Sequence, residues 1–437
     1  MRDYALFLAF FGMLPFILKR PVIGLLVYAF FSLMNPHRLT YGSAYDFPFA
    51  AIIAAVTLIS VLLTPQEKRL PKTPVTMILI LFFCWMTFTS IFALEPHLVW
   101  AGWEAVMKTF LMMFLTMAVV KNEKEIKNLA LVLALSLGFY GVKGGIFTIM
   151  SGGVNRVHGP TGTYIADNND LALALLISIP ILWFVRLYAP AKWLRITLTF
   201  ILLLTVIAVI GTYSRGALLA GLVMLLLLWV KSSHKLQVGL LAIITIPIGL
   251  LFMPEKWMDR MSTISEYDSD ASALGRINAW EFAINLALDR FIGGGFNVFT
   301  PNMFHVYAPD PLDFHVAHSI YFRVLGEHGF VGLGLFLLLI ILTWKSANKV
   351  IKLCKNKLEL KWASDLAAMT QVSIIGYAVG GAFLSLSYYD LFYYIVALIF
   401  LLEKIIVFQE LNCLSSPYLK DSIKSFESIS IIKKYEN

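Results

Sequence analysis

The chain has 437 residues, of which 59% are hydrophobic and only 14% are charged, and its mean hydropathy is +0.77. Soluble globular domains carry about 25% charged residues, so this composition excludes a soluble domain and predicts an all-α polytopic membrane protein. The net charge of +8 does not indicate nucleic-acid binding, because the lysines and arginines lie between apolar segments, where they act as topology signals.

Apolar segments of the length that a membrane-spanning helix needs, about 20 residues, follow one another along the chain. The first two are short, and together the segments predict about 12–13 transmembrane helices. They cover residues 4–18, 22–34, 46–64, 76–93, 98–120, 128–150, 169–187, 193–210, 214–230, 236–253, 325–344, 364–385 and 388–407.

Lysine and arginine cluster in alternate connections, from Lys19-Arg20 to a group of six lysines between residues 345 and 361. By the positive-inside rule, these connections face the cytoplasm. The intervening connections then face outward, including a polar outer loop at 254–317 that carries nine acidic and four basic residues. The expected regions are an N-terminal transmembrane region (1–127), central helices (128–253), the outer loop (254–317), C-terminal helices (318–407) and a cytoplasmic tail (408–437).

The outer loop is too long to be featureless in a compact protein. Within residues 273–290, large apolar side chains recur at roughly helical spacing: Ile277, Trp280, Ile284, Leu286 and Leu288. This pattern predicts an amphipathic helix that lies on the membrane surface. Gly293-Gly294-Gly295 is expected to end the helix, and a proline- and aspartate-containing turn at 309–315 then leads to His318.

Three residues are the candidate catalytic groups. His318 lies about 10 Å beyond the predicted outer end of its span, at 1.5 Å per residue, and a histidine there is able to accept a proton at neutral pH. Arg215 lies at the outer end of the ninth span, against the usual charge bias, and Arg276 lies on the predicted surface helix. Guanidinium groups suit bidentate recognition of phosphate. The alternatives are a loop histidine without a role, an arginine that snorkels, and an ion pair of Arg276 with Asp270 or Glu281.

Further polar residues near the same face form a candidate substrate-binding set: Lys143, Asn168, Asn169, Ser319, Arg323 and Glu327. Lys143 lies toward the outer end of the sixth span. Residues 167–170 open the seventh span, where a helix cap is the simpler interpretation and sugar binding is the alternative. Arg323 and Glu327 are i,i+4 neighbours, and we expect them to orient the helix that bears His318.

No cofactor and no metal site are expected. His315 and His318 have an i,i+3 spacing but lack a well-placed third ligand. The acidic residues Glu266, Asp268 and Asp270 lack the glycine and the spacing of a calcium loop. Three scattered cysteines make no metal site, and no phosphate-binding glycine loop is present.

The motifs around these residues resemble a known superfamily. His318-Ser319, followed after nine residues by Gly329 and then Gly332, is similar to the histidine motif of the O-antigen ligase and O-antigen polymerase superfamily. Arg215 followed by Leu219 resembles the outward arginine motif of that superfamily, and a large outer loop before the histidine is its hallmark. Residues 2–42 and 156–175 look most like the O-glycosylation ligases encoded alongside exosortase systems.

This resemblance implies a membrane glycosyltransferase of the bacterial inner membrane, with its active site facing the periplasm. It would take a glycan from an undecaprenyl-diphosphate carrier and pass it to an acceptor, by analogy a protein hydroxyl. Arg215 and Arg276 would bind the diphosphate, and His318 would act on or position the acceptor. A ligase acting on lipid A core and a polysaccharide polymerase are the nearest alternatives. A flippase or transporter is disfavoured because the ionisable groups crowd the outer boundary and no internal repeat is present.

Overall fold

The structure is a computed structural model, and it describes residues 2–65, 70, 71, 73–231, 235, 236, 239, 253–262 and 271–414. In these residues all regular structure is helical, without a strand. Eight of the described helices are long and apolar enough to cross a membrane. The chain is therefore an all-α polytopic membrane protein, as its composition predicts.

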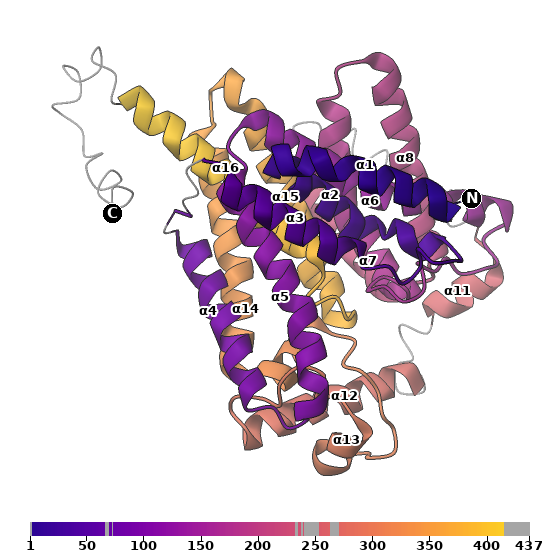
Figure 1. Cartoon of the computed structure of the whole chain (residues 1–437). Helices are drawn as coiled ribbons and strands as arrows, with labels where there is room; N and C mark the ends of the chain where they lie inside the picture. The colour runs from indigo at the N-terminus through magenta and orange to yellow at the C-terminus, as the bar shows by residue number, and fades with distance from the viewer. Residues whose placement is uncertain are drawn as a thin grey trace.

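The eight candidate spans form the body of the molecule (Figure 1). They are α4 (Pro74–Ile91), α5 (Pro96–Val119), α6 (Glu123–Met150), α7 (Asn168–Leu187), α8 (Lys192–Gly211), α14 (Ile320–Leu353), α15 (Lys361–Gly380) with the flanking turns η3 (Leu358–Leu360) and η4 (Gly381–Phe383), and α16 (Asp390–Leu414). α16 lies at the centre, because residues 391–402 are at most 3% exposed and α2, α5, α6, α14 and α15 all pack against it. In α8, by contrast, only 22% of the apolar window is buried within the protein.

The sequence predicts 12–13 spans, whereas eight helices in the described part of the chain are both long enough and apolar enough to cross a membrane. The N-terminal helices α2 (Pro21–Met34) and α3 (Phe49–Leu63) have 14 and 15 residues, fewer than the roughly 20 that a bilayer requires. α2 packs against α1 (Arg2–Lys19), α3 and α6, and α3 packs against α1. Figure 1 shows α1 and α3 running crosswise to the spans α4 and α5. α9 (Arg215–Lys231) has 17 residues. Most of the predicted segment 236–253, and the acidic run at 266–270, lie outside the described residues.

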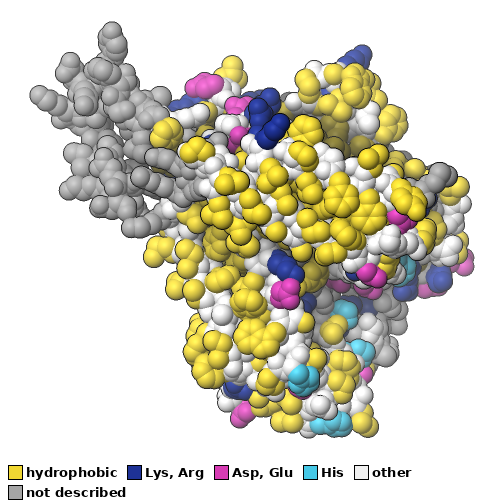
Figure 2. Space-filling view, in the orientation of Figure 1, with side chains coloured by type: hydrophobic (Ala, Val, Ile, Leu, Met, Phe, Trp, Pro, Cys, Tyr) yellow, Lys and Arg dark blue, Asp and Glu magenta, His cyan; other side chains and the backbone are white. Residues whose placement is uncertain are grey.

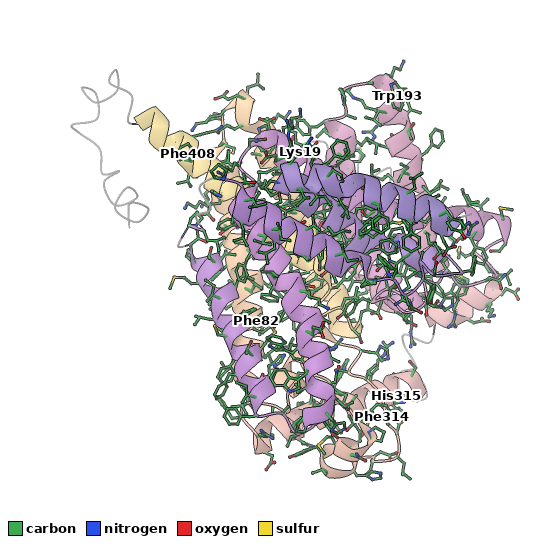
Figure 3. All side chains as sticks on the ribbon, viewed as in Figure 1. Lys19, Phe82, Trp193, Phe314, His315 and Phe408 are labelled. Carbon is green, nitrogen blue, oxygen red and sulfur yellow. The ribbon has the colours of Figure 1, made fainter. Side chains whose placement is uncertain are left out.

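Polar and apolar side chains separate along the molecule. Figure 2 shows hydrophobic side chains over most of one face, histidines gathered in its lower part, and lysines and arginines both at its upper edge and at a few places lower down. In Figure 3, Lys19 and Trp193 lie near the upper end, His315 lies near the opposite end, and Phe82 lies between them. Lys19 belongs to a predicted cytoplasmic connection and His315 to the predicted outer loop, so the arrangement follows the alternation of charge along the sequence.

The outer loop contains three described helices, α11 (Glu255–Ser262), α12 (Ala271–Asp289) and α13 (Pro301–Tyr307). The predicted helix at 273–290 is confirmed as α12, while its position on the membrane surface stays a prediction. Ile284 and Leu288 are 38% and 69% exposed. The buried face consists of Ala279, Phe282, Ala283, Leu286 and Ala287, packed with Val298, Phe304 and Leu325. Because three of these five are alanines, α12 approaches α14 closely instead of resting that face on the membrane.

A glycine triplet after α12 completes a break in α14. Gly329 has φ +65° and ψ −166° inside this helix. This break interrupts the helical hydrogen-bond pattern, so the carbonyls of the turn before Gly329 need donors from other segments. Gly294 N donates to Gly326 O at 2.9 Å, and Gly295 N donates to Glu327 O at 2.7 Å. Trp85 of α4 donates its indole N–H to His328 O at 2.8 Å. Three successive carbonyls thus receive donors from two other segments, as buried backbone requires.

We expect Gly329→Ala to detach the outer loop from α14. A Cβ at this position would lie 1.9 Å from Phe291 O, and the combination of positive φ with extended ψ, which essentially only glycine adopts, costs another residue about 1–3 kcal/mol. With the overpacking, typically about 1–3 kcal/mol, the free energy of unfolding should fall by about 2–6 kcal/mol. Thermal unfolding and limited proteolysis of the outer loop in detergent measure this.

Gly334→Ala is the matched control, because Gly334 lies on the same helix and a Cβ there meets nothing within 4 Å. It should melt at the wild-type temperature or slightly above it. Equal melting temperatures for Gly329→Ala and wild type would contradict the role assigned to the break.

Candidate functional site

His318 is held at the outer end of α14 by residues on both sides of it. Trp280 of α12 donates its indole N–H to Ala317 O at 2.7 Å and stacks on Phe322, with ring centroids 4.9 Å apart. Ser319 caps α14 and is fully buried. His318 itself has φ +42°, a conformation that non-glycine residues adopt uncommonly. The backbone at His318 is therefore held in this conformation by its neighbours on both sides, two residues before the helix begins.

The electrostatic environment keeps the His318 imidazole neutral. Burial, and then the positive charge of Arg276, lower the pKa of His318 from its usual value of 6.5. The side chain is therefore uncharged at pH 7. Its Nδ1 lies 3.4 Å from Ser385 Oγ. When Nδ1 carries the proton and donates to Ser385, Nε2 holds a lone pair and can act as a base.

The connection between η4 and α16, residues 384–389, joins several of the polar groups around His318. Ser385 N donates to Asp170 Oδ1 at 3.1 Å, Ser385 Oγ meets His318, and Arg323 donates to Ser385 O at 3.4 Å. Ser387 Oγ donates to Ile320 O at 3.3 Å. This segment therefore brings α7, α14 and the His318 turn together.

Arg323 and Glu327 form the ion pair that their spacing predicts, with Arg323 Nε 3.3 Å from Glu327 Oε1. Glu327 also accepts hydrogen bonds from Tyr388 Oη at 2.7 Å and Asn297 N at 3.1 Å. The Arg323 guanidinium lies over the Tyr388 ring, 5.1 Å from its centroid. The Glu327 side chain is 1% exposed, and that of Arg323 is 24% exposed. The pair is thus a buried network that links α14 to the 384–389 connection and to the outer loop.

Arg276 lies one helical turn before Trp280 on α12, and the contacts of α12 place it near His318. Asn278 donates to the carbonyls of Asp310 and Asp313, both at 2.8 Å. This anchors α12 to the turn that leads to His318. Arg276 interacts electrostatically with both His318 and Asp170. The sequence assigned Arg276 only by its place in the outer loop, and the structure brings it to the histidine.

Arg215 begins α9, which packs against η4, the turn just before the 384–389 connection. Asn168 donates to Thr212 O at 2.8 Å, which holds the turn before α9 against the start of α7. A Cβ on Gly216 would lie 3.2 Å from Phe383 Cβ, so Arg215 is adjacent to the segment that contacts His318. α9, α12 and the His318 turn therefore converge, although they are far apart in sequence.

The remaining candidates divide between structural roles and the periphery. Asp167 caps α7 by accepting a hydrogen bond from Asn169 N at 2.8 Å, as the capping interpretation predicts. The Asn169 amide also donates to Asp167, and Asn168 supports the turn before α9. Lys143 is exposed on α6. None of the contacts that the structure records for Lys143 reaches His318.

Two residues of this site were missed by the sequence analysis, Ser385 and Tyr388, and Asp170 was considered only as part of the capping sequence at 167–170. The sequence gives little indication of a role for Ser385 and Tyr388, because they lie in a short stretch between two apolar segments that looks like an ordinary interhelical connection. Asp170 belongs to the capping sequence at 167–170. Only the folded structure shows that these residues lie near His318, Arg276 and Arg323.

Within the described residues, no group of three or more His, Cys, Asp or Glu side chains is placed to hold a metal ion. His315 pairs with Asp313 at 2.8 Å, and both side chains are about 40% exposed. The positively charged side chains near His318 and Ser385 include Arg276 and Arg323.

Comparison with known families assigns two parts of the chain. Residues 200–337 match the family model described as O-Antigen ligase, and this stretch contains Arg215, Arg276 and His318. Residues 1–189 match a family of unknown function, DUF5935. No curated protein matches the chain. The first match supports the O-antigen ligase superfamily and, with it, a membrane enzyme of the ligase or glycosyltransferase type.

We expect Glu327→Ala to destabilise the site strongly. Removing this carboxylate leaves the Arg323 guanidinium partly buried without its ion-pair partner, and breaking a buried pair costs about 3–5 kcal/mol. Thermal unfolding in detergent measures the loss. Glu104→Ala is the matched control, because Glu104 and Lys108 form an exposed i,i+4 pair on α5. Wild-type melting of Glu104→Ala together with a marked loss for Glu327→Ala is the expected pattern, and equal melting of the two variants would refute it.

Proposed function

We propose that the protein transfers a glycan from an undecaprenyl-diphosphate carrier to an acceptor hydroxyl at the periplasmic face of the bacterial inner membrane. The observation that carries the proposal is the placement of a neutral histidine beside Arg276, with Arg215 on the neighbouring helix end. All three lie within the stretch that matches O-Antigen ligase. This combination suits a donor that leaves as an anion and an acceptor that must lose a proton.

In the proposed reaction, the acceptor oxygen attacks the anomeric carbon of the first sugar. The acceptor O–H bond breaks as His318 Nε2 takes the proton, a role for which Ser385 orients the ring. The bond between the anomeric carbon and the phosphate oxygen breaks, and undecaprenyl diphosphate leaves with that electron pair. The acceptor–glycan bond forms in the same exchange, so atoms and charge balance without an oxidant or a nucleotide.

Arg215 and Arg276 are proposed to bind the diphosphate. Charge accumulates on the leaving phosphate in the transition state, and fixed donors aimed at it stabilise that state more than the ground state. Guanidinium groups suit this task because they offer paired N–H donors to phosphate oxygens. The diphosphate is already an activated leaving group, so we propose that the reaction needs no metal.

The acceptor is proposed to be a hydroxyl of a protein side chain, by analogy with the exosortase-associated ligases that the N-terminal stretch resembles. A ligase acting on lipid A core and a polysaccharide polymerase use the same chemistry with a different nucleophile. The product of the reaction distinguishes these cases, since a polymerase lengthens the glycan on its own lipid carrier.

Glycan transfer should depend on all three proposed catalytic residues. We expect His318→Ala to lower the rate about 10²–10⁴-fold, the usual contribution of a general base. Arg215→Ala and Arg276→Ala should each lower it about 10²–10³-fold. The assay supplies purified protein with lipid-linked glycan and candidate acceptors in the presence of a chelator. Lys192→Ala, which removes an exposed cation from α8, should keep wild-type activity; undiminished transfer by His318→Ala and Arg215→Ala would refute the mechanism.

The dependence of transfer on pH should report the environment of His318. Only the neutral imidazole accepts a proton, so kcat/KM should be constant near pH 7 and fall as acid protonates His318. Because burial and Arg276 lower its pKa, the midpoint of that fall should lie below 6.5. Arg276→Gln removes the larger of the two charges that lower this pKa, those of Arg276 and His315, and should move the midpoint upward, besides slowing transfer. A midpoint above 7 in wild type, or one that Arg276→Gln leaves in place, would contradict this assignment.

A further inference from the structure

Asp170 lies beside the proposed catalytic groups, yet the proposed reaction gives it no task. It is the third residue of α7, after the N-cap Asp167. An acidic residue at this position commonly serves its own helix, by completing a capping box or by opposing the helix dipole. Here Asp167 already supplies the cap, since its side chain accepts a hydrogen bond from Asn169 N. The Asp170 carboxyl group instead accepts from Ser385 N, 215 residues further along the chain.

This contact holds the first part of the 384–389 connection. The distance from Ser385 N to Asp170 Oδ1 is 3.1 Å. Later in the connection, Tyr377 Oη donates to two successive carbonyls, at 2.9 and 3.2 Å. Those bonds leave the Ser385 backbone to two other groups in the described part of the chain, Asp170 and Arg323, which donates to Ser385 O at 3.4 Å. The contact to Asp170 is the shorter of the two.

The start of α7 is a firm support for Ser385. Residues 171–178 of this helix are all buried. Asn168, itself buried, donates its side-chain amide to Thr212 O at 2.8 Å. Groups carried by packed helices are placed more precisely than groups carried by loops. Through its hydrogen bond, Asp170 therefore fixes Ser385 relative to a packed helix.

The orientation of the His318 ring depends on where Ser385 lies. His318 Nδ1 and Ser385 Oγ are 3.4 Å apart, near the long limit for a hydrogen bond, so a small displacement of Ser385 away from the ring would break the contact. When Nδ1–H donates to Ser385, Nε2 keeps the lone pair that takes the acceptor proton. The other tautomer, with the proton on Nε2, cannot act as that base.

We propose that Asp170 is a positioning residue for the proposed base. By holding Ser385 N against α7, it places Ser385 Oγ where it accepts from His318 Nδ1, and so selects the tautomer with a basic Nε2. Asp170 acts through Ser385 and contacts neither substrate. Its importance for catalysis rests on the proposed function, whereas its effect on the His318 ring does not.

Nitrogen NMR of the full-length protein in detergent, with isotope-labelled histidine, tests the positioning without any substrate. The signals of His318 are those lost in His318→Ala. At a pH above the pKa of His318, their shifts report which ring nitrogen carries the proton, and wild type should carry it on Nδ1. Asp170→Ala should shift the tautomer ratio toward Nε2–H by up to about tenfold, the effect of one hydrogen bond. An unchanged ratio in Asp170→Ala, or a wild-type proton on Nε2, overturns the proposal.

Transfer kinetics then measure the consequence for catalysis. Asp170→Ala should lower kcat about tenfold, which corresponds to about 1.4 kcal/mol, and should leave the KM for the donor within about twofold of wild type. Asp170→Asn should recover most of the rate, because its amide oxygen accepts the same hydrogen bond. Asp170 also interacts electrostatically with Arg276 and Arg323. If Asp170→Asn is as slow as Asp170→Ala, the charge of the carboxylate is what matters, and positioning through Ser385 is overturned.

A double-mutant cycle separates an action through Ser385 from a general loss of structure. Ser385→Ala should also lower kcat about tenfold, and adding Asp170→Ala should change it further by no more than about twofold. Losses that multiply would show that Asp170 acts by another route. Asp365→Ala is the matched control, because Asp365 accepts a hydrogen bond from Tyr188 at the other end of α7, at 2.8 Å. This variant should keep the wild-type kcat.

Failure of this proposal and failure of the proposed function give different results. A His318 tautomer that depends on Asp170, in a protein that transfers no glycan, supports the positioning and refutes the proposed function. Glycan transfer that requires His318 but proceeds at the wild-type rate in Asp170→Ala supports the proposed function and overturns the positioning.

Discussion

The interruption of α14 at Gly329 is the constraint from which the arrangement of the outer face follows. A helix at a membrane boundary cannot leave successive carbonyls without donors, because little water is available to replace them. The glycine triplet at 293–295 supplies two donors and Trp85 supplies the third. The outer loop is thereby fixed to α14 by backbone hydrogen bonds, which depend little on the side chains elsewhere in the loop. Because α12 ends just before the glycine triplet, this junction also fixes the position of α12 and of Arg276 on it.

Around that junction the polar groups form one connected system. His318 contacts Ser385, Ser385 contacts Asp170, and Glu327 joins Arg323 to Tyr388. In a low-dielectric environment such networks fix geometry when each member is satisfied. Burial and the positive charge of Arg276 lower the pKa of His318. In the proposed reaction, the neutral histidine accepts a proton while arginines bind the diphosphate, so the two tasks fall to different side chains.

Sequence reasoning identified what local patterns control. Apolar runs predicted the helices, Asp167 was recognised as a cap, and the i,i+4 spacing of Arg323 and Glu327 predicted their ion pair. Local patterns could not predict contacts between segments that are distant in the sequence. Ser385 contacts Asp170 of α7, and Tyr388 contacts Glu327 of α14. The residues next to them in the sequence give no indication of these partners. The helical pattern of α12 was correct, but its buried face follows the alanine stripe that fits α14 rather than the largest apolar side chains.

The 384–389 connection also has a consequence for how the protein is made. It follows every other segment that contributes to the site, and only α16 comes after it in the described chain. The hydrogen-bond donors that complete α14 precede Gly329 in sequence, so that junction has its partners as soon as α14 is inserted. His318 does not, because its partner Ser385 is synthesised only after α15. During biosynthesis, the nascent chain thus acquires its outer architecture before its histidine is oriented, and the proposed site is complete only once α15 and the 384–389 connection have been made.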